Sequence, residues 1–456
     1  MEKESVKNYL AIISVLFIEG FVSLSFQMLY IRQLTPFVGN SVEVVSWIIG
    51  VFLIALAIGY KKGGSHPDTE IVPILIKNLY LSFFIAGIGL SFMFLEIYFG
   101  SNILSSYSLM IIYCFLIIFP TTYFLGQTLP LITNIMKGKN VAEISGNILF
   151  LSTIGSFLGA IITTNILLRY FGVSITIFIN LCLIVALIIF LDLYKKQKDL
   201  LFKSFLLSIS LIFMYAINIP IENGNFVRTN QYANYKIINA GKLKIFSSNK
   251  SYSSILDNEN KYGYIKFLEK LIFEDLKIKD KDILVIGAGG FLFSKNMEYT
   301  KNRFTYVDID PEIKDIAEKT FLNESINGRF IPLDGRNFIN ENKNKFDVIF
   351  LDAYSSKLSM PSHLLTEEFF LKVKEDVKED GIIVINTIFK TDFKDEFSMK
   401  LNKTITNIFE NCYVHVITPN LIASNVEYIC FNHNPVKSYS DDKNNSNSDF
   451  YNLLKE

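Results

Sequence analysis

A glycine run and a nearby aspartate form the clearest ligand-binding pattern in this sequence. The run Gly287-Ala-Gly-Gly290 directly follows the apolar stretch 283–286, which predicts a buried strand. Glycines at the end of a first strand let the backbone approach a ligand closely. Asp308 lies 21 residues after Gly287, at the end of the next predicted strand, where an acid can accept hydrogen bonds from both hydroxyls of a ribose. The pattern predicts a nucleotide-type ligand bound by Gly287, Gly289, Gly290 and Asp308.

Two further aspartates close predicted strands. Asp334, followed by Gly335, ends the strand predicted over 328–332, and Asp352 ends the strand predicted over 346–351. Because ligands of open α/β sheets lie at the carboxyl ends of the strands, we expect Asp308, Asp334 and Asp352 to converge on one crevice. A carboxylate there could hold a cationic amine, or take its proton as the amine attacks an electrophilic carbon. One strand-end aspartate is more often a helix cap or turn former, but three in succession favour a site.

Alternating strands and helices are needed to position these residues. Extended segments over 235–239 and 242–247, joined by an Asn-Ala-Gly turn, precede a helix predicted over 260–278. The strands that follow are predicted over 283–286, 303–307, 328–332, 346–351 and 381–387, with helices from Leu292 and over 312–320. This alternation predicts a mostly parallel, doubly wound sheet. The glycine run lacks the third glycine of the dinucleotide fingerprint, which favours an α/β class I S-adenosylmethionine-type (Rossmann-like) domain over a dehydrogenase.

The first half of the chain is strongly apolar. A helix needs about 20 mostly apolar residues to cross a bilayer. Seven runs are long enough: 9–31, 42–60, 72–95, 105–126, 147–168, 171–191 and 202–219. The sequence thus predicts a multi-span helical membrane domain over 1–220, a small β element with a linking helix over 221–280, the Rossmann-like domain over 281–435, and a mobile tail over 436–456. We expect a multi-pass protein of the cell (inner) membrane.

The lysines of the connecting loops bear on orientation. They cluster in alternate loops and at the amino terminus, which the positive-inside rule places in the cytoplasm: Lys3, Lys7, Lys61, Lys62, Lys137, Lys139, Lys195, Lys196 and Lys198. An odd number of spans then puts the carboxyl-terminal domain outside, whereas a domain that uses a cytoplasmic cosubstrate should lie inside. Either one segment does not cross, such as 202–219 or a re-entrant stretch 126–135, or the domain is extracytoplasmic. The sequence leaves both alternatives open.

Polar residues inside the first span also allow two interpretations. Glu19 and Gln27 could line a substrate path, or they could make hydrogen bonds between helices. Gly155 and Gly159 form a GxxxG pair that suits close helix packing within the bundle. The zero net charge over 456 residues argues against a nucleic-acid-binding surface, and four cysteines are too few for a disulfide framework.

The motifs from about Gln231 to about Thr387 resemble the polyamine aminopropyltransferase (spermidine synthase) family. Tyr264 resembles the family tyrosine ahead of the nucleotide fold, and 307–310 resembles its ribose-binding acid motif. The pair Asp334-Gly335 resembles the motif that contacts the adenine amino group, and 346–352 resembles the strand that ends in the catalytic aspartate. The stretches 352–356 and 360–366, together with 27–32 and 126–130 in the apolar half, look like a membrane-fused branch of the family.

This resemblance implies transfer of an aminopropyl group from decarboxylated S-adenosylmethionine to an amine such as putrescine, with methylthioadenosine as the leaving group. Asp352 would be catalytic, Tyr264, Tyr354 and Ser355 would contact the amine, and no metal or tightly bound cofactor would be required. Phe291 and Ser355 depart from the family pattern, because the soluble enzymes carry aspartates there that help bind the amine. We expect the bilayer and a small amine as partners and no nucleic acid, and a homo-oligomer is compatible with the sequence.

Two other functions fit the same sequence. The missing acids favour a methyltransferase-like enzyme that uses intact S-adenosylmethionine on a membrane-associated substrate. Alternatively, the helical half could be a polyamine transporter in which Glu19, Gln27 and Gln127 line a path. A preference for decarboxylated over intact S-adenosylmethionine would separate the first function from the second.

Overall fold

The computed structural model describes residues 2–67, 71–101, 103–135, 141–194, 199–258, 260–354, 360–417 and 424–432. The chain forms two compact units. The first comprises Met1–Asn258 with the short segments Lys319–Asn323 and Tyr354–Pro361, and the second comprises the remainder. Ser355 and the tail 436–456 therefore lie outside the described residues.

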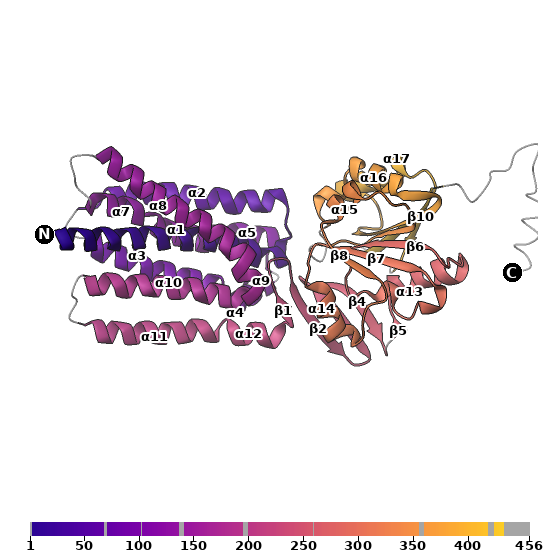
Figure 1. Ribbon diagram of the computed structural model, residues 1–456, viewed down its shortest axis with the longest axis horizontal. Helices are drawn as coiled ribbons and strands as arrows, with labels where there is room; N and C mark the ends of the chain where they lie inside the picture. The colour runs from indigo at the N-terminus through magenta and orange to yellow at the C-terminus, as the bar shows by residue number, and fades with distance from the viewer. Residues whose placement is uncertain are drawn as a thin grey trace, which may run out of the picture. The chain divides into compact units, whose positions relative to one another are not determined.

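The first unit contains a bundle of long apolar helices (Figure 1). The helices are α1 (Glu2–Val38), α2 (Val42–Gly64), α3 (Ile71–Gly89), α4 (Phe92–Gly100), α5 (Ser106–Tyr113), α6 (Phe119–Gly126), α7 (Thr128–Ile135), α8 (Val141–Ile162), α9 (Leu168–Phe171), α10 (Val173–Tyr194), α11 (Leu200–Ala216) and α12 (Ile219–Asn225). Within the described residues, seven segments are long and apolar enough to cross a membrane, as predicted: Ile13–Val38, Val42–Gly64, Ile71–Gly89, Ser106–Asn134, Ala142–Phe171, Val173–Tyr194 and Leu201–Asn225.

Two boundaries in the bundle differ from those predicted. The fourth segment does not end at residue 126, because it continues through α7 to Asn134. The seventh segment does not end near residue 219, because α12 prolongs it to Asn225. Pro220 is compatible with this continuation, since it occupies the first turn of α12, where its missing N–H group costs nothing.

The predicted GxxxG pair packs α8 against α1. A Cβ atom at Gly155 would lie 2.2 Å from the Phe17 carbonyl oxygen, and one at Gly159 would lie 2.2 Å from that of Phe21. Gly20 makes the reciprocal approach, since its Cβ would lie 2.3 Å from the Ser152 carbonyl oxygen. The small residues therefore serve packing inside the bundle.

Arg32, near the end of α1, joins the bundle to the small sheet of the same unit. Its Nε donates to the Asn230 carbonyl oxygen and its Nη2 to Asn234 Oδ1, both at 2.6 Å. The side chain is 5% exposed, so these hydrogen bonds are needed to offset the desolvation of the guanidinium. Glu19 and Gln27 are also buried in α1.

The small sheet begins with four antiparallel strands, β1 (Arg228–Thr229), β2 (Asn234–Ala240), β3 (Leu243–Ser248) and β4 (Ser251–Asp257), followed by the short β5 (Asn260–Lys261). The predicted hairpin is present. Ala240 pairs with Leu243, which leaves Gly241 and Lys242 as a two-residue turn, and Gly241 has the positive φ that such turns require.

The second unit is built on a seven-stranded sheet with the order β11-β12-β10-β9-β6-β7-β8. The strands are β6 (Asp282–Ile286), β7 (Arg303–Asp308), β8 (Arg329–Pro332), β9 (Phe346–Leu351), β10 (Val377–Phe389), β11 (Cys412–Val416) and β12 (Ser424–Phe431). The first five are parallel to one another, whereas β12 runs antiparallel to β10 and β11 antiparallel to β12. The predicted Rossmann-like domain is confirmed.

The two faces of this sheet carry different elements (Figure 1). On one face, alternate strand residues such as Leu284 and Ile385 share a core with α15 (Gly335–Glu341), α16 (Glu367–Asp376) and α17 (Glu396–Ile408). On the other face, α13 (Tyr264–Glu269) places Tyr264 against Phe350 of β9, with ring centroids 6.5 Å apart. Successive residues of a strand therefore point alternately to the face covered by α15, α16 and α17 and to the face that carries α13.

Two predicted helices are wrong in extent. The helix expected from Leu292 is only a 3-10 turn over Leu292–Ser294. The rings of Phe291 and Phe293 both turn into the core, and Asn296 adopts a positive φ, so tertiary burial overrides the helical pattern. The helix expected over 260–278 is shorter, since α13 ends at Glu269 and a π-helical turn continues to Asp275.

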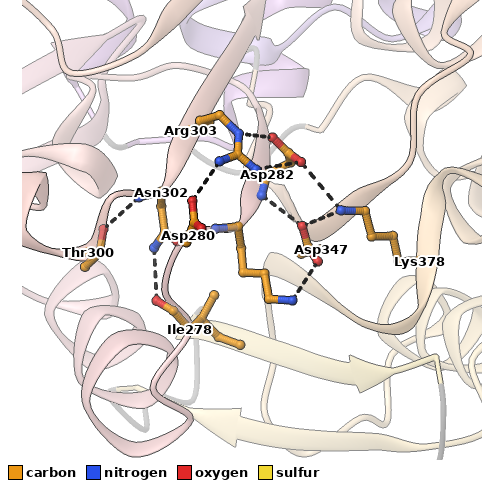
Figure 2. Close-up of polar contacts among 9 residues, drawn as sticks. Ile278, Asp280, Asp282, Thr300, Asn302, Arg303, Asp347 and Lys378 are labelled. Carbon is orange, nitrogen blue, oxygen red and sulfur yellow. Dashed lines mark hydrogen bonds and ion pairs between the residues drawn. The ribbon is translucent and has the colours of Figure 1, made fainter.

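The amino ends of the parallel strands are tied together by ion pairs (Figure 2). Arg303 at the start of β7 donates to Asp282 at the start of β6 at 2.6 Å. Lys378 of β10 donates to Asp347 of β9 at 2.7 Å, and Asp347 also accepts the backbone N–H of Asp282. This network fastens neighbouring strands at the edge opposite to the strand-end aspartates.

Candidate functional site

The glycine run lies where the strand order of the parallel sheet reverses. From β6 the chain passes to β7 on one side, and β9 pairs on the other side, so the carboxyl ends of β6 and β9 form a topological switch point. Gly287 has φ +92°, and a Cβ there would lie 2.3 Å from the Asp352 carbonyl oxygen. Gly289 also has a positive φ. Only glycine fits at Gly287, because a side chain would separate the two strand ends.

Asp308 lies beside this run at the end of β7, as predicted. Its Oδ2 accepts the Ala288 N–H and its Oδ1 accepts the Asp310 N–H, both at 3.0 Å. Burial raises the pKa of Asp308 to about 6, although these two backbone hydrogen bonds lower it. A carboxylate oxygen has more than one lone-pair direction, so each oxygen retains capacity to accept a ribose hydroxyl.

Asp352 is clamped between two donors at the end of β9. The Tyr264 hydroxyl donates to Oδ2 and the Asn386 amide donates to Oδ1, both at 2.7 Å. Burial raises the pKa of Asp352 to about 7, although both hydrogen bonds lower it. A carboxylate with this pKa can accept a proton near neutral pH.

Asn386 was missed by sequence reasoning. The available signal was a polar residue near the end of the otherwise apolar strand β10, in the run Ile382-Ile-Val-Ile-Asn386. Its own orientation is supported by Asn425 of β12, whose amide donates to Asn386 Oδ1 at 2.9 Å. Because Asn386 comes from a strand next to β9, only the strand order shows that it reaches Asp352.

Asp334 caps α15. Its Oδ1 accepts the backbone N–H groups of Arg336 and Asn337 at 3.0 Å, and its Oδ2 lies 2.9 Å from His363 Nε2. Gly335 packs closely on the end of β6, since a Cβ there would lie 2.5 Å from Ile286 Cγ2. The cap explains the local need for an aspartate, and the adenine contact of Asp334 and Gly335 stays a prediction.

The two positions that depart from the resembled family differ in what they contribute. The Phe291 ring is 1% exposed and packs against Tyr306 at 4.8 Å and Phe330 at 5.7 Å, so it belongs to the core. Tyr354 is partly buried two residues after Asp352, and Ser355 lies outside the described residues. The roles predicted for Tyr354, Ser355 and Gly290 in binding stay predictions.

The parallel sheet, its switch point, the glycine run after β6 and the carboxylates at the carboxyl ends of β7, β8 and β9 define a nucleotide-type α/β domain. Residues 270–441 match the spermine/spermidine synthase domain family. The carboxyl-terminal part of the chain is thus similar to the family that its motifs resemble.

Individual relatives match different shares of the chain. The chain is 31% identical to a probable polyamine aminopropyl transferase of Bifidobacterium longum over 129 residues, which is 28% of each protein. It is 30% identical to the polyamine aminopropyltransferase of Vibrio vulnificus over 154 residues, which is 32% of this chain and 50% of that protein. It is 20% identical to polyamine aminopropyltransferase 2 of Aquifex aeolicus over 414 residues, which is 86% of this chain and 81% of that protein.

Solved structures also resemble the chain. A probable spermidine synthase from Corynebacterium glutamicum has a TM-score of 0.38 and 17% identity, covering 49% of this chain and 84% of that one. The spermidine synthase of Thermotoga maritima has a TM-score of 0.36 and 18% identity, covering 46% and 74%.

Proposed function

We propose that the protein is a membrane-bound aminopropyltransferase that moves an aminopropyl group from decarboxylated S-adenosylmethionine to an amine of the putrescine type. The observation that carries this proposal is the carboxylate of Asp352, held by Tyr264 and Asn386 at the switch point of the sheet with its pKa raised to about 7. The seven apolar segments support insertion of the chain into a bilayer as a multi-pass membrane protein.

The proposed reaction is a single displacement. The lone pair of the acceptor nitrogen attacks the aminopropyl carbon next to the sulfonium, the carbon–sulfur bond breaks with its electrons going to sulfur, and methylthioadenosine leaves. Asp352 takes one proton from the acceptor nitrogen as the carbon–nitrogen bond forms, so the product nitrogen leaves as a neutral amine and the carboxyl group is protonated. Asp308 and the glycine run hold the nucleoside, and Tyr264 and Asn386 keep the carboxylate of Asp352 aimed at the acceptor.

Donor choice tests this proposal directly. We expect calorimetry on the detergent-solubilised protein to show tighter binding of decarboxylated S-adenosylmethionine and methylthioadenosine than of intact S-adenosylmethionine. A preference for the intact donor would instead support methyl transfer, and binding of none of the three would reject an enzymatic role for the site.

The rate should depend on pH through Asp352. Because only the ionised carboxylate can accept the proton, kcat/KM should fall about tenfold per pH unit below about 7. Replacing Asn386 by alanine removes a hydrogen bond that lowers the pKa of Asp352, so the acidic limb should move to higher pH. Initial rates of both proteins between pH 5.5 and 9 measure this, and coincident acidic limbs would exclude Asp352 as the group that titrates.

Asp308 should control the binding of the nucleoside. The Asp308→Asn variant keeps the size of the side chain but loses charge-assisted hydrogen bonds to a ribose, so the Kd for methylthioadenosine should rise about 10- to 100-fold. The exposed Asp380 on β10 provides a matched control, since Asp380→Asn should leave this Kd unchanged. Calorimetry measures both, and an unaltered Kd in Asp308→Asn would remove Asp308 from the nucleoside site.

A further inference from the structure

Glu427 on β12 projects toward the same side of the sheet as Asp352. Its flanking residues Val426 and Tyr428 belong to the core beneath the helices, so Glu427 projects to the opposite face, where α13 carries Tyr264. Glu427 pairs directly with Asn386 of β10 in the antiparallel register, and Asn386 donates to Asp352. Side chains opposite each other on such strands are neighbours, so a row of polar groups runs from Asp352 through Asn386 to Glu427.

The carboxyl group of Glu427 is buried without a partner. Its side chain is 0% exposed, and neither carboxylate oxygen accepts a hydrogen bond from any residue that the structure describes. Burial raises the pKa of Glu427 well above its usual value, and the charge of Asp352 raises it further. Desolvating an unpartnered carboxylate is costly, and an apolar residue on this strand would be more stabilising, so the group is better explained by a ligand than by the fold.

On the next strand, His415 pairs directly with Glu427. The His415 ring stacks on Phe267 of α13, with centroids 4.1 Å apart and planes 7° apart. Phe267 lies one turn after Tyr264 on the same helix. The stacked rings therefore border the polar row on its far side from Asp352.

We propose that Glu427 is a second carboxylate of the acceptor site and binds the distal ammonium group of a diamine or polyamine whose reacting nitrogen lies at Asp352. This proposal rests on the aminopropyl transfer proposed above and specifies its acceptor as a molecule with two cationic nitrogens. Phe291 stands where the resembled family carries an acid, but its uncharged ring is buried in the core. Glu427 supplies a charge for the acceptor from a different strand.

Glu427→Gln tests the proposal, because it keeps the shape of the side chain and removes only its capacity for charge. With 1,4-diaminobutane as the acceptor, KM should rise about 10- to 100-fold while kcat changes little. With butylamine, which has one nitrogen, KM should be unchanged. The Kd for methylthioadenosine should match that of the unmodified protein, and the unfolding temperature should not fall, because the substitution removes no hydrogen bond within the described residues.

The exposed Glu379 on β10 supplies the control, since Glu379→Gln should alter neither KM. An unchanged KM for the diamine in Glu427→Gln, or an equal rise for both amines, would overturn the proposal for Glu427 while leaving the transferase activity intact. If the unmodified protein bound no donor and turned over neither amine, the proposed function itself would fail, and the binding of 1,4-diaminobutane by the two variants would still report on Glu427.

A different observation concerns the side of the membrane on which the α/β domain lies. Cys412 on β11 pairs directly with Cys430 on β12, and the two form a disulfide. This pairing was not expected from the number of cysteines in the sequence. Disulfides persist in oxidising compartments and are rare in the cytosol.

The distribution of basic residues along the helical bundle indicates the same side of the membrane independently. With seven crossings, the start of α1 and the ends of α2, α7 and α10 lie at one end of the bundle. In the sequence, the lysines of the helical half that flank these helix ends include Lys61, Lys62, Lys137, Lys139, Lys195, Lys196 and Lys198. Arg32 and Arg169 lie at the other end, where Arg32 contacts Asn230 and Asn234 of the small sheet. By the positive-inside rule, the lysine-bearing end is cytoplasmic and the small sheet is not.

We infer that all seven segments cross the membrane and that the α/β domain, which follows the small sheet in the chain, lies on the extracytoplasmic side. This inference does not depend on the proposed reaction. If the reaction is as proposed, donor and acceptor must both be available outside the cytoplasm, so the donor would have to be exported after its synthesis.

Labelling of cysteines that are introduced one at a time into the full-length protein tests this orientation in intact cells. Lys242→Cys lies in the β2–β3 turn and Ser65→Cys lies after α2, and both positions are exposed. A membrane-impermeant maleimide should label Lys242→Cys before permeabilisation and Ser65→Cys only afterwards, and Cys412 and Cys430 should resist alkylation until a reductant is added. The reverse order of labelling, or alkylation of both native cysteines without a reductant, would overturn the inference.

Discussion

Replacing Asp352 by asparagine is expected to lower kcat about 100- to 10,000-fold while the Kd for methylthioadenosine stays the same. A positioned general base contributes roughly 10²–10⁴-fold to a rate, and asparagine keeps the shape of the side chain but cannot take a proton. The nucleoside is assigned to Asp308 and the glycine run, so its binding should not require the charge of Asp352. Single-turnover rates and calorimetry on the same preparation measure the two effects separately.

The exposed Asp380 is again the matched control, because Asp380→Asn makes the same chemical change in the same sheet away from the switch point. It should retain full activity. If Asp352→Asn retained near-normal turnover, Asp352 would not be the base. If it lost methylthioadenosine binding together with activity, the role of Asp352 would be structural.

Gly287→Ala is expected to abolish donor binding and to destabilise the α/β unit by about 3–5 kcal/mol. The new Cβ would lie 2.3 Å from the Asp352 carbonyl oxygen, and this contact is with backbone, which cannot rotate away. The positive φ of 92° adds strain for any side chain. The ends of β6 and β9 would have to separate, which displaces Asp352 and the nucleoside site together.

The Gly241→Ala variant distinguishes the effect of backbone strain from the effect of a steric clash. Gly241 also has a positive φ, of 62°, but a Cβ there would meet nothing within 4 Å. This variant should cost only about 1 kcal/mol and leave donor binding unchanged. Denaturant unfolding followed in the unit that carries each substitution, with calorimetry for the donor, measures both variants. Equal effects of the two substitutions would show that backbone strain, and not the close approach of β6 and β9, determines the need for Gly287.

The strand-end residues show how the two halves of the proposed chemistry are divided. Asp308 and the glycines use backbone proximity and fixed hydrogen bonds to hold a nucleoside, and their geometry depends on β6 and β7. In the proposed acceptor site, Asp352 and Glu427 use charge and Asn386 orients Asp352, and these residues come from β9, β10 and β12. A change to either group should therefore alter one substrate and leave the other, which is why each test above measures both substrates.

Much of this organisation was readable from local sequence signals. Runs of about 20 apolar residues identify membrane-crossing helices because the thickness of the bilayer sets their length. The strand Phe346–Leu351 was predicted with its observed bounds, since a short apolar run closed by an aspartate is a local pattern. The juxtaposition of the glycine run and Asp308 also follows from the sequence, because two consecutive parallel strands bring their carboxyl ends together.

Other features were decided only by the tertiary structure. The helix expected from Leu292 is replaced by a short turn, because burial of Phe291 and Phe293 outweighs local helical preference. The contacts of Asn386, Glu427 and the Cys412–Cys430 pair depend on which strands are neighbours and in what register, and these pairings join residues far apart in the chain. Sequence alone determined the elements and the residue types able to do chemistry, whereas the order and register of the strands decided which of those residues meet, because side-chain contacts across a sheet are set by packing and not by local sequence.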